Sequence, residues 1–142
     1  MSDYDFSEKV LVLTRASGGI GLATAEYFFE CGASIVATYN DNLAIIELAE
    51  NLDASAKRFF MMQVDVADSE SCLRFAKECQ ERFGSIDFLV NNASVLRMAS
   101  VQEMTEALWR EVMSSNLDAV AISASKESLL PRSLASYFLI IL

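Results

Sequence analysis

Histidine is absent from this 142-residue chain, and cysteine and proline are scarce. Because imidazole is a common general base and metal ligand near neutral pH, its absence excludes His-based catalytic triads and argues against a transition-metal site. The three cysteines, Cys31, Cys72 and Cys79, show no C-x-x-C spacing. We therefore expect no bound metal and a reducing compartment.

Basic residues are also few, since 11 lysines and arginines stand against 20 acidic residues and give a net charge of −9. Binding to nucleic acid or to an anionic membrane surface requires a basic patch, so this balance argues against both partners. The apolar run 137–142 is far too short to span a bilayer, and the residues before the first apolar segment are unlike a signal peptide. We expect a cytoplasmic protein that acidic helix faces keep in solution.

Three of the five glycines, Gly18, Gly19 and Gly21, lie in one short segment. The apolar run 10–13 before them is typical of a buried parallel strand, and residues 22–29 after them are typical of a helix. A strand, a glycine-rich turn and a helix in this order direct backbone N–H groups and a helix N-terminus at a phosphate. We interpret the segment as a dinucleotide-binding turn; the alternative is an ordinary tight turn.

Apolar runs alternate with amphipathic segments along the rest of the chain. The pattern predicts strands over 34–39, 58–64 and 86–91, and helices over 42–53, 68–84 and 101–117. This order predicts a single α/β domain over 1–142, with a doubly wound parallel sheet that is incomplete at its C-terminal side. The pattern is clear to about residue 118, and Pro131 interrupts the degenerate tail 119–142.

Four short motifs recur in the order of one enzyme family. Residues 14–21 (T-R-A-S-G-G-I-G) align with a T-G-x-x-x-G-x-G turn, Asp65-Val66 follow the third predicted strand, the N-N-A-S segment 91–94 follows the fourth, and Asn116 lies in the next helix. Over residues 8–120 the chain resembles the short-chain dehydrogenase/reductase family of single-domain Rossmann oxidoreductases, which use NAD or NADP. The resemblance implies hydride transfer between this cofactor and an alcohol or ketone substrate.

The resemblance also implies roles for individual residues. Those expected to bind the dinucleotide are Thr14, Arg15, Ser17, Gly18, Gly19, Ile20, Gly21, Tyr39, Asn40, Asp65, Val66, Asn92 and Ala93. Asn116 matches a member of the family's catalytic tetrad. Structural roles are the alternatives: Asp65 could cap a strand end, Asn91 and Asn92 could satisfy backbone groups, and Asn116 could face solvent on a surface helix.

Arg15 departs from the family pattern, because it stands in the place of the first glycine of the turn. If the backbone needs a positive φ there, a side chain costs about 1–2 kcal/mol. Alternatively, the guanidinium adds a positive charge near the pyrophosphate or a 2′-phosphate. Ser94, also in the place of a glycine, is a milder departure.

The catalytic Tyr-x-x-x-Lys pair of the family is missing from these residues, because Tyr4, Tyr27, Tyr39 and Tyr137 have no lysine four positions on. The pair provides a phenol, with its pKa lowered by a cation, that exchanges a proton with the substrate oxygen. Without this phenol the resemblance implies little or no carbonyl reduction.

Residues 122–130 (I-S-A-S-K-E-S-L-L) resemble the family's Tyr-Ser-Ala-Ser-Lys helix, with isoleucine for tyrosine and Lys126 at the catalytic-lysine position. Ile122 follows Asn116 by only six residues, which is far too few. We hypothesise an internal deletion near residue 120; the alternative is a chance match. In either case we expect the fourth strand to lack its usual neighbour. The run 138–142 could cover that edge, fold back as a helix or drive homo-oligomerisation.

The end of the second predicted strand bears on cofactor choice. NAD specificity normally uses an acidic residue there, whereas this chain has Tyr39 and Asn40. We therefore favour NADP over NAD, although Asp41 could restore a preference for NAD. Three functions stay open: an oxidoreductase acting on a small alcohol or ketone with a degenerate catalytic part, a non-catalytic nucleotide-binding module or partner subunit, and a truncation product without function.

Overall fold

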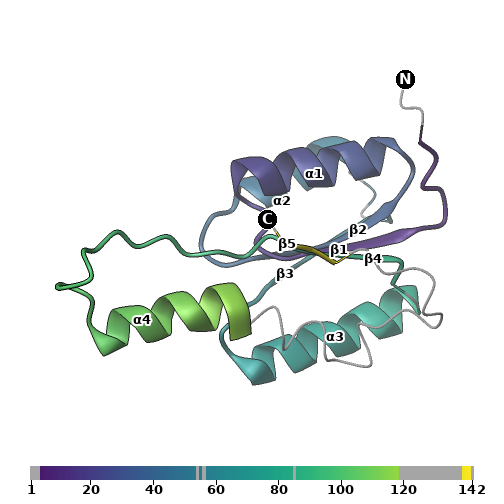
Figure 1. Ribbon diagram of the computed structural model, residues 1–142. Helices are drawn as coiled ribbons and strands as arrows, with labels where there is room; N and C mark the ends of the chain where they lie inside the picture. Colours follow the sequence, from purple (N-terminus) through teal and green to yellow (C-terminus); the bar gives the residue numbers. More distant parts are fainter. Residues whose placement is uncertain (1–3, 54, 56, 85, 119–138, 142) are drawn as a thin grey trace.

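A parallel sheet of five strands forms the centre of the molecule (Figure 1). The computed structural model describes residues 4–53, 55, 57–84, 86–118 and 139–141. The strands lie in the order β3-β2-β1-β4-β5, and all neighbours pair in parallel. Their bounds are β1 Val10–Leu13, β2 Ser34–Tyr39, β3 Phe59–Gln63, β4 Phe88–Asn91 and β5 Leu139–Ile141.

Helices lie on both faces of this sheet. α1 (Gly19–Glu30) and α2 (Ala44–Leu52) lie on one face, and α3 (Ser69–Phe83) lies on the other (Figure 1). α4 (Glu106–Met113) continues into a π-helix, Ser114–Asp118, and projects away from the sheet at the left of the same view. This arrangement confirms the predicted doubly wound α/β fold.

The central strand β1 is fully buried because it has a strand on each side and a helical layer on each face. Alternate side chains along a strand point to opposite faces. Leu11 and Leu13 accordingly belong to the core cluster with α1 and α2, whereas Val10 and Val12 belong to the cluster with α3. A strand buried on both faces is apolar at every position, which is why the run 10–13 identifies it.

The cysteines lie within these layers. Cys31, Cys72 and Cys79 are all buried and form no disulfide. Burial raises the pKa of Cys79 to about 12. Because the thiolate is the reactive form of cysteine, Cys79 is a packing residue rather than a nucleophile.

A side-chain cap fixes the predicted helix start at α3. The Asp68 carboxylate accepts hydrogen bonds from the backbone N–H groups of Glu70 (3.2 Å) and Ser71 (3.1 Å), and Gly84 ends α3 with φ 71°. These boundaries confirm the predicted ends of α3. At α2 the N-cap is Leu43, which provides no side-chain hydrogen bond, so the predicted cap, Asn42, lies one residue too early. Asn42 Oδ1 nevertheless accepts a hydrogen bond from the Ala44 N–H at 2.9 Å.

The helix predicted over 101–117 starts later than expected. Residues 101–103 form turns, and α4 begins at Glu106 because the Thr105 hydroxyl caps it by accepting a hydrogen bond from the Leu108 N–H at 3.2 Å. The predicted start at 101 is therefore wrong. The C-terminal turn of the predicted helix is a π-helix rather than an α-helix. Within the described ranges no helix is both long and apolar enough to cross a bilayer.

The outer edge of β4 is paired with β5. The β5 backbone pairs in parallel with β4, with Leu139 opposite Leu89 and Ile141 opposite Asn91. Of the three alternatives for the run 138–142, the structure therefore shows coverage of the edge, by residues 139–141. Lys126 and the hypothesised deletion site near 120 lie outside the described residues.

Asp53 closes the connection between α2 and β3. Its carboxylate accepts hydrogen bonds from the Ser55 hydroxyl (2.7 Å) and from the backbone N–H groups of Arg58 (2.6 Å) and Phe59 (3.0 Å). These donors, the Ser55 hydroxyl first, lower the pKa of Asp53 from its ordinary value. A carboxyl group whose pKa is lowered by folding stabilises the fold above its unfolded-state pKa, and this contribution disappears as the pH falls through the folded-state pKa.

We expect Asp53→Asn to lower the free energy of unfolding at about pH 7 and to have less effect as the pH falls below about 4. Urea unfolding of both proteins across this range measures the difference. The matched control is Glu50→Gln, which removes a negative charge from an exposed position of α2 and should leave stability nearly unchanged. A deficit for Asp53→Asn that stays constant with pH contradicts the prediction.

Candidate functional site

The carboxyl ends of the parallel strands meet at one edge of the sheet, and the loops after β1, β2, β3 and β4 surround two adjoining hollows. The strand-end hollow has a volume of about 270 Å³ and is lined by Arg15, Thr38, Tyr39, Asn40, Asp41, Val64, Asp65, Val66, Ala93, Ser94, Val95, Arg97, Glu111 and Ser115. The glycine-turn hollow has a volume of about 380 Å³ and is lined by Arg15, Gly18, Gly19, Ile20, Gly21, Asn92, Ser94 and Leu96.

The two hollows bring together most of the residues that the sequence assigns to a dinucleotide. Every predicted cofactor-binding residue lines one of them except Thr14 and Ser17, which are buried. Arg15 and Ser94 line both hollows and so mark their junction. Among the described residues, no group of three or more acidic, cysteine or histidine side chains is placed to hold a metal ion.

Thr14 joins the glycine turn to the end of β4. Its buried hydroxyl oxygen accepts hydrogen bonds from two backbone N–H groups, those of Asn92 (3.0 Å) and Ala93 (3.1 Å). Its own N–H donates to the Val90 carbonyl at 3.1 Å. Thr14 therefore positions the walls of the site and does not itself line a hollow.

Arg15 has φ +48°. The backbone of the turn is therefore left-handed at this position, which is strained for a residue with a side chain. Hydrogen bonds on both sides hold the backbone there: the Arg15 N–H donates to the Thr38 hydroxyl at 2.9 Å, and the Arg15 carbonyl accepts from Asn92 Nδ2 at 2.8 Å. The Arg15 side chain is exposed, and none of the ion pairs seen among the described residues includes it. Its guanidinium is thus available to an anion at the junction of the hollows.

The glycines of the turn have two different reasons to be glycine. A Cβ on Gly21 would lie 2.8 Å from the backbone of Ala16 and from Asn92 Nδ2, so close packing of α1 on the turn requires glycine there. A Cβ on Gly18 or Gly19 would meet nothing within 4 Å. The protein itself therefore leaves open space at these two positions.

The N-terminus of α1 has no partner of its own among the described side chains. Gly18 is the N-cap and provides no side-chain hydrogen bond, and the first turn holds no acidic residue. The Ser17 hydroxyl is buried without a hydrogen-bond partner, and the Ser17 carbonyl accepts from Asn42 Nδ2 at 3.0 Å. Free N–H groups and a helix N-terminus facing an open hollow have the chemistry of an anion site.

Asp65 has the structural role that was the alternative to cofactor contact, and it also lines the strand-end hollow. Its Oδ1 accepts a hydrogen bond from the Ala67 N–H at 2.9 Å, and its carbonyl accepts one from the Asp68 N–H at 3.0 Å. Val66 lines the same hollow beside it. A role as turn cap therefore does not remove either residue from the site.

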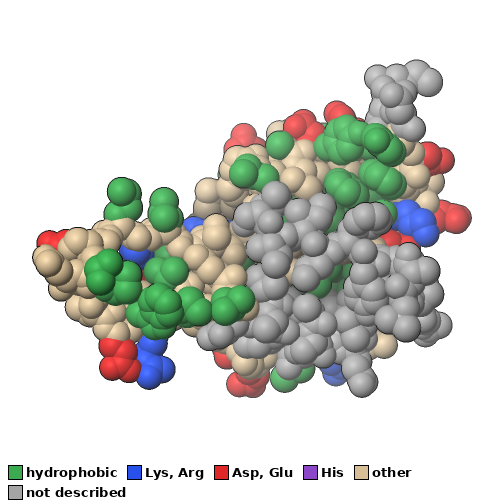
Figure 2. Space-filling view, in the orientation of Figure 1, with side chains coloured by type: hydrophobic (Ala, Val, Ile, Leu, Met, Phe, Trp, Pro, Cys, Tyr) green, Lys and Arg blue, Asp and Glu red, His purple; other side chains and the backbone are tan. Residues whose placement is uncertain are grey.

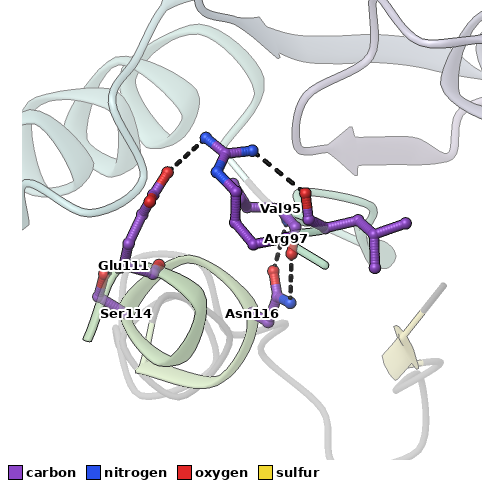
Figure 3. A network of polar contacts seen from close by, with 6 residues as sticks. Val95, Arg97, Glu111, Ser114 and Asn116 are labelled. Atoms are coloured by element: carbon purple, nitrogen blue, oxygen red, sulfur yellow. Dashed lines mark hydrogen bonds and ion pairs between the residues drawn. The ribbon is translucent and has the colours of Figure 1, made fainter. Parts of the chain in front are cut away.

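Asn116 does not face solvent, which was one alternative for it. Its amide binds both backbone groups of Val95: Oδ1 accepts from the Val95 N–H at 2.6 Å, and Nδ2 donates to the Val95 carbonyl at 2.9 Å (Figure 3). Arg97, two residues further along the same loop, forms an ion pair with Glu111 of α4 (Figure 3). Asn116 therefore fixes the loop that follows β4.

Asn91 and Asn92 differ in their surroundings. Asn92 ties the turn to the β4 end through its N–H and its side-chain amide, as the structural alternative for it proposes. Asn91 is buried at 3% exposure, and its Nδ2 has no hydrogen-bond partner among the described residues. Asn91 thus lies beneath the site, whereas Asn92 is half-buried and lines the glycine-turn hollow.

Sequence reasoning missed several residues of the site. Thr38 and Asn42 support the turn from 23 and 25 positions away, and Val95, Arg97, Glu111 and Ser115 line the strand-end hollow. A polar residue inside an apolar strand is a signal that could have identified Thr38. The residues of the β4 loop and of the helix after it carry no such signal in the sequence. They line the hollow only because α4 packs beside that loop.

We expect Gly21→Ala to destabilise the fold by about 1–3 kcal/mol, because its Cβ would overlap backbone atoms of Ala16. Gly19→Ala is the matched control, since it adds the same methyl group to the same helix in open space and should change stability by less than about 0.5 kcal/mol. Urea unfolding of the three proteins measures both effects. Equal stability of the two variants would contradict this view of the turn.

The comparisons with known proteins agree with this geometry. A sequence profile described as short chain dehydrogenase matches residues 9–129. The 3-oxoacyl-(acyl-carrier-protein) reductase of Escherichia coli is 31% identical over 116 residues, which cover 82% of this chain and 46% of that protein. A cis-4-hydroxycyclohexanecarboxylate dehydrogenase of Sinomonas cyclohexanicum is 34% identical over 125 residues, covering 82% and 47%. The chain spans about half the length of the curated relatives it matches.

Solved structures show the same arrangement. A short-chain dehydrogenase/reductase from Brucella melitensis superposes with a TM-score of 0.82 at 35% identity, covering 87% of this chain and 52% of that one. A short chain dehydrogenase from Burkholderia cenocepacia, solved in complex with NADP, superposes with a TM-score of 0.78 at 28% identity, covering 84% and 49%.

Proposed function

This chain belongs to the short-chain dehydrogenase family, and we propose that it binds NADP(H) across the strand-end and glycine-turn hollows. We further propose that these 142 residues transfer hydride between NADP(H) and alcohols or ketones weakly or not at all. The cofactor supplies the hydride chemistry in this family, whereas the protein supplies binding, orientation and proton transfer. The residues of this chain therefore have to be judged separately for cofactor binding and for proton transfer.

The observation that carries the binding proposal is the open space at Gly18 and Gly19. No atom of the described residues requires glycine at either position, whereas a phosphate group lying against the turn does, because a Cβ would occupy its place. The uncapped N-terminus of α1 adds hydrogen-bond donors to the same region. We assign the pyrophosphate to the glycine-turn hollow and the adenosine to the strand-end hollow.

Arg15 supports the preference for NADP over NAD. Its guanidinium lines the strand-end hollow together with Tyr39, Asn40 and Asp41, the residues at the end of β2. A 2′-phosphate on the adenosine ribose would lie against this end of β2. Arg15 offers that phosphate a positive charge, whereas Asp41 opposes it.

The catalytic part of the proposal rests on the side chains that would move a proton. Asn116 uses both ends of its amide to hold Val95, so we propose that it positions the loop after β4 rather than touching the reacting atoms. None of the four tyrosines has a lysine four positions on, so these residues lack a phenol paired with a cation. Weak or absent turnover follows from that missing proton donor.

We expect NADP⁺ to raise the thermal unfolding midpoint of the purified chain. A ligand at a hundredfold excess over its Kd stabilises the folded state by about 2.7 kcal/mol, which is a rise of several degrees for a domain of this size. Gly19→Ala should abolish most of this rise while keeping the unliganded midpoint, because its methyl group occupies the phosphate position. Differential scanning calorimetry measures both quantities.

An unliganded transition that is cooperative but does not move with NADP⁺ would overturn the binding proposal. The catalytic half has its own test, because NADPH absorbance reports turnover on a panel of ketones. Steady oxidation of NADPH by the purified chain would show that it does not need the missing phenol.

Arg15→Ala and Arg15→Gly separate the charge of Arg15 from its backbone strain. Both variants remove the guanidinium, so we expect both to reduce the ratio of NADP⁺ to NAD⁺ affinity roughly tenfold. Only Arg15→Gly also relieves the positive φ, so it should exceed Arg15→Ala in stability by about 1 kcal/mol. Isothermal titration measures the affinities, and urea unfolding measures the stabilities. An unchanged ratio of NADP⁺ to NAD⁺ affinity would contradict a role for Arg15 in cofactor binding.

A further inference from the structure

We propose that Arg97 and Glu111 act as a clamp that positions the loop after β4 as the outer wall of the strand-end hollow. In this role both are positioning residues for the dinucleotide. The inference rests on the proposed nucleotide site and names residues that the family motifs do not include. It predicts that breaking the ion pair weakens cofactor binding although neither residue need touch the cofactor.

The first observation is where the pair lies. Arg97 and Glu111 both line the strand-end hollow, one from the loop and one from α4. One guanidinium nitrogen of Arg97 donates to Glu111 Oε1, and another donates to the Leu96 carbonyl at 3.2 Å (Figure 3). The guanidinium is therefore already engaged on two sides within the wall itself.

The second observation is how little else holds this loop. Leu96, Met98 and Val101 are 82–92% exposed, and Figure 2 shows apolar side chains gathered on the surface of this projecting part. Among the described residues, the tertiary hydrogen bonds of segment 95–100 go to Glu111 and Asn116. Within the described part of the chain, two side-chain contacts therefore hold this wall, Asn116 on Val95 and Glu111 on Arg97.

Glu111 lies in α4, and Asn116 lies in the π-helix that continues α4. Their side chains reach the same segment, at residues two apart. No residue of α4 is buried, and these two contacts join α4 and its continuation to the loop after β4.

The third observation is the sign of the charge on Glu111. The hollow already holds Asp41 and Asp65, and an anionic cofactor is disfavoured by a further carboxylate on its wall. Holding Arg97 gives this carboxylate a function that offsets the repulsion. The two effects predict opposite results when the charge is removed, which makes the inference testable.

The experiment is titration of NADP⁺ into the full chain and into Glu111→Gln. Loss of the clamp should weaken NADP⁺ binding about threefold to fivefold, the range that an exposed ion pair can supply. If electrostatic repulsion alone mattered, the same substitution would tighten binding. The matched control is Glu106→Gln, which removes the partner of Arg110 on the same helix but does not line the hollow, and it should leave the affinity unchanged.

A charge reversal completes the test. Arg97→Glu should weaken binding, and combining it with Glu111→Arg should restore affinity toward that of the parent chain, because the pair is re-formed with opposite polarity. Tighter or unchanged binding by Glu111→Gln, or a double variant no better than Arg97→Glu, would overturn the clamp. Failure of the parent chain to bind NADP⁺ would instead overturn the proposed function.

Discussion

The site depends on one buried hydroxyl. The Thr14 hydroxyl oxygen accepts hydrogen bonds from the backbone N–H groups of Asn92 and Ala93, just after β4. Without this acceptor, these donors would lack a partner. The same residue begins the glycine turn, so the position of the turn and the position of the β4 loop cannot vary independently. Because each of the two hollows takes walls from both segments, Thr14 sets their relation to each other.

Arg15 shows how strongly that arrangement is fixed. A left-handed backbone is unfavourable for arginine, yet the Thr38 hydroxyl and the Asn92 amide bind the peptide groups on either side of it. The conformation that a glycine would adopt freely is thus imposed on a residue with a side chain. Arg15 lines both hollows, and none of the ion pairs among the described residues includes it.

The sequence predicted the fold well where burial is complete and poorly where α4 leaves the body. The run 10–13, the Asp68 cap and Gly84 each report a local constraint, and the two elements that they define, β1 and α3, are where they were expected. The start of α4 was wrong because residues 101–104 are compatible with a helix, and the Thr105 cap decided the boundary. Thr38, Asn42 and Glu111 were missed because their contacts join segments that are far apart in the chain.

The walls of the two hollows are anchored in different ways. The glycine turn is held by buried groups of the central strands, whose hydrogen bonds are shielded from water. The wall from the loop and α4 is held by a half-exposed ion pair and one asparagine amide, and α4 buries no residue. In the binding mode that we propose, contacts to the pyrophosphate depend mainly on buried groups of the core, whereas contacts to the adenosine depend also on α4.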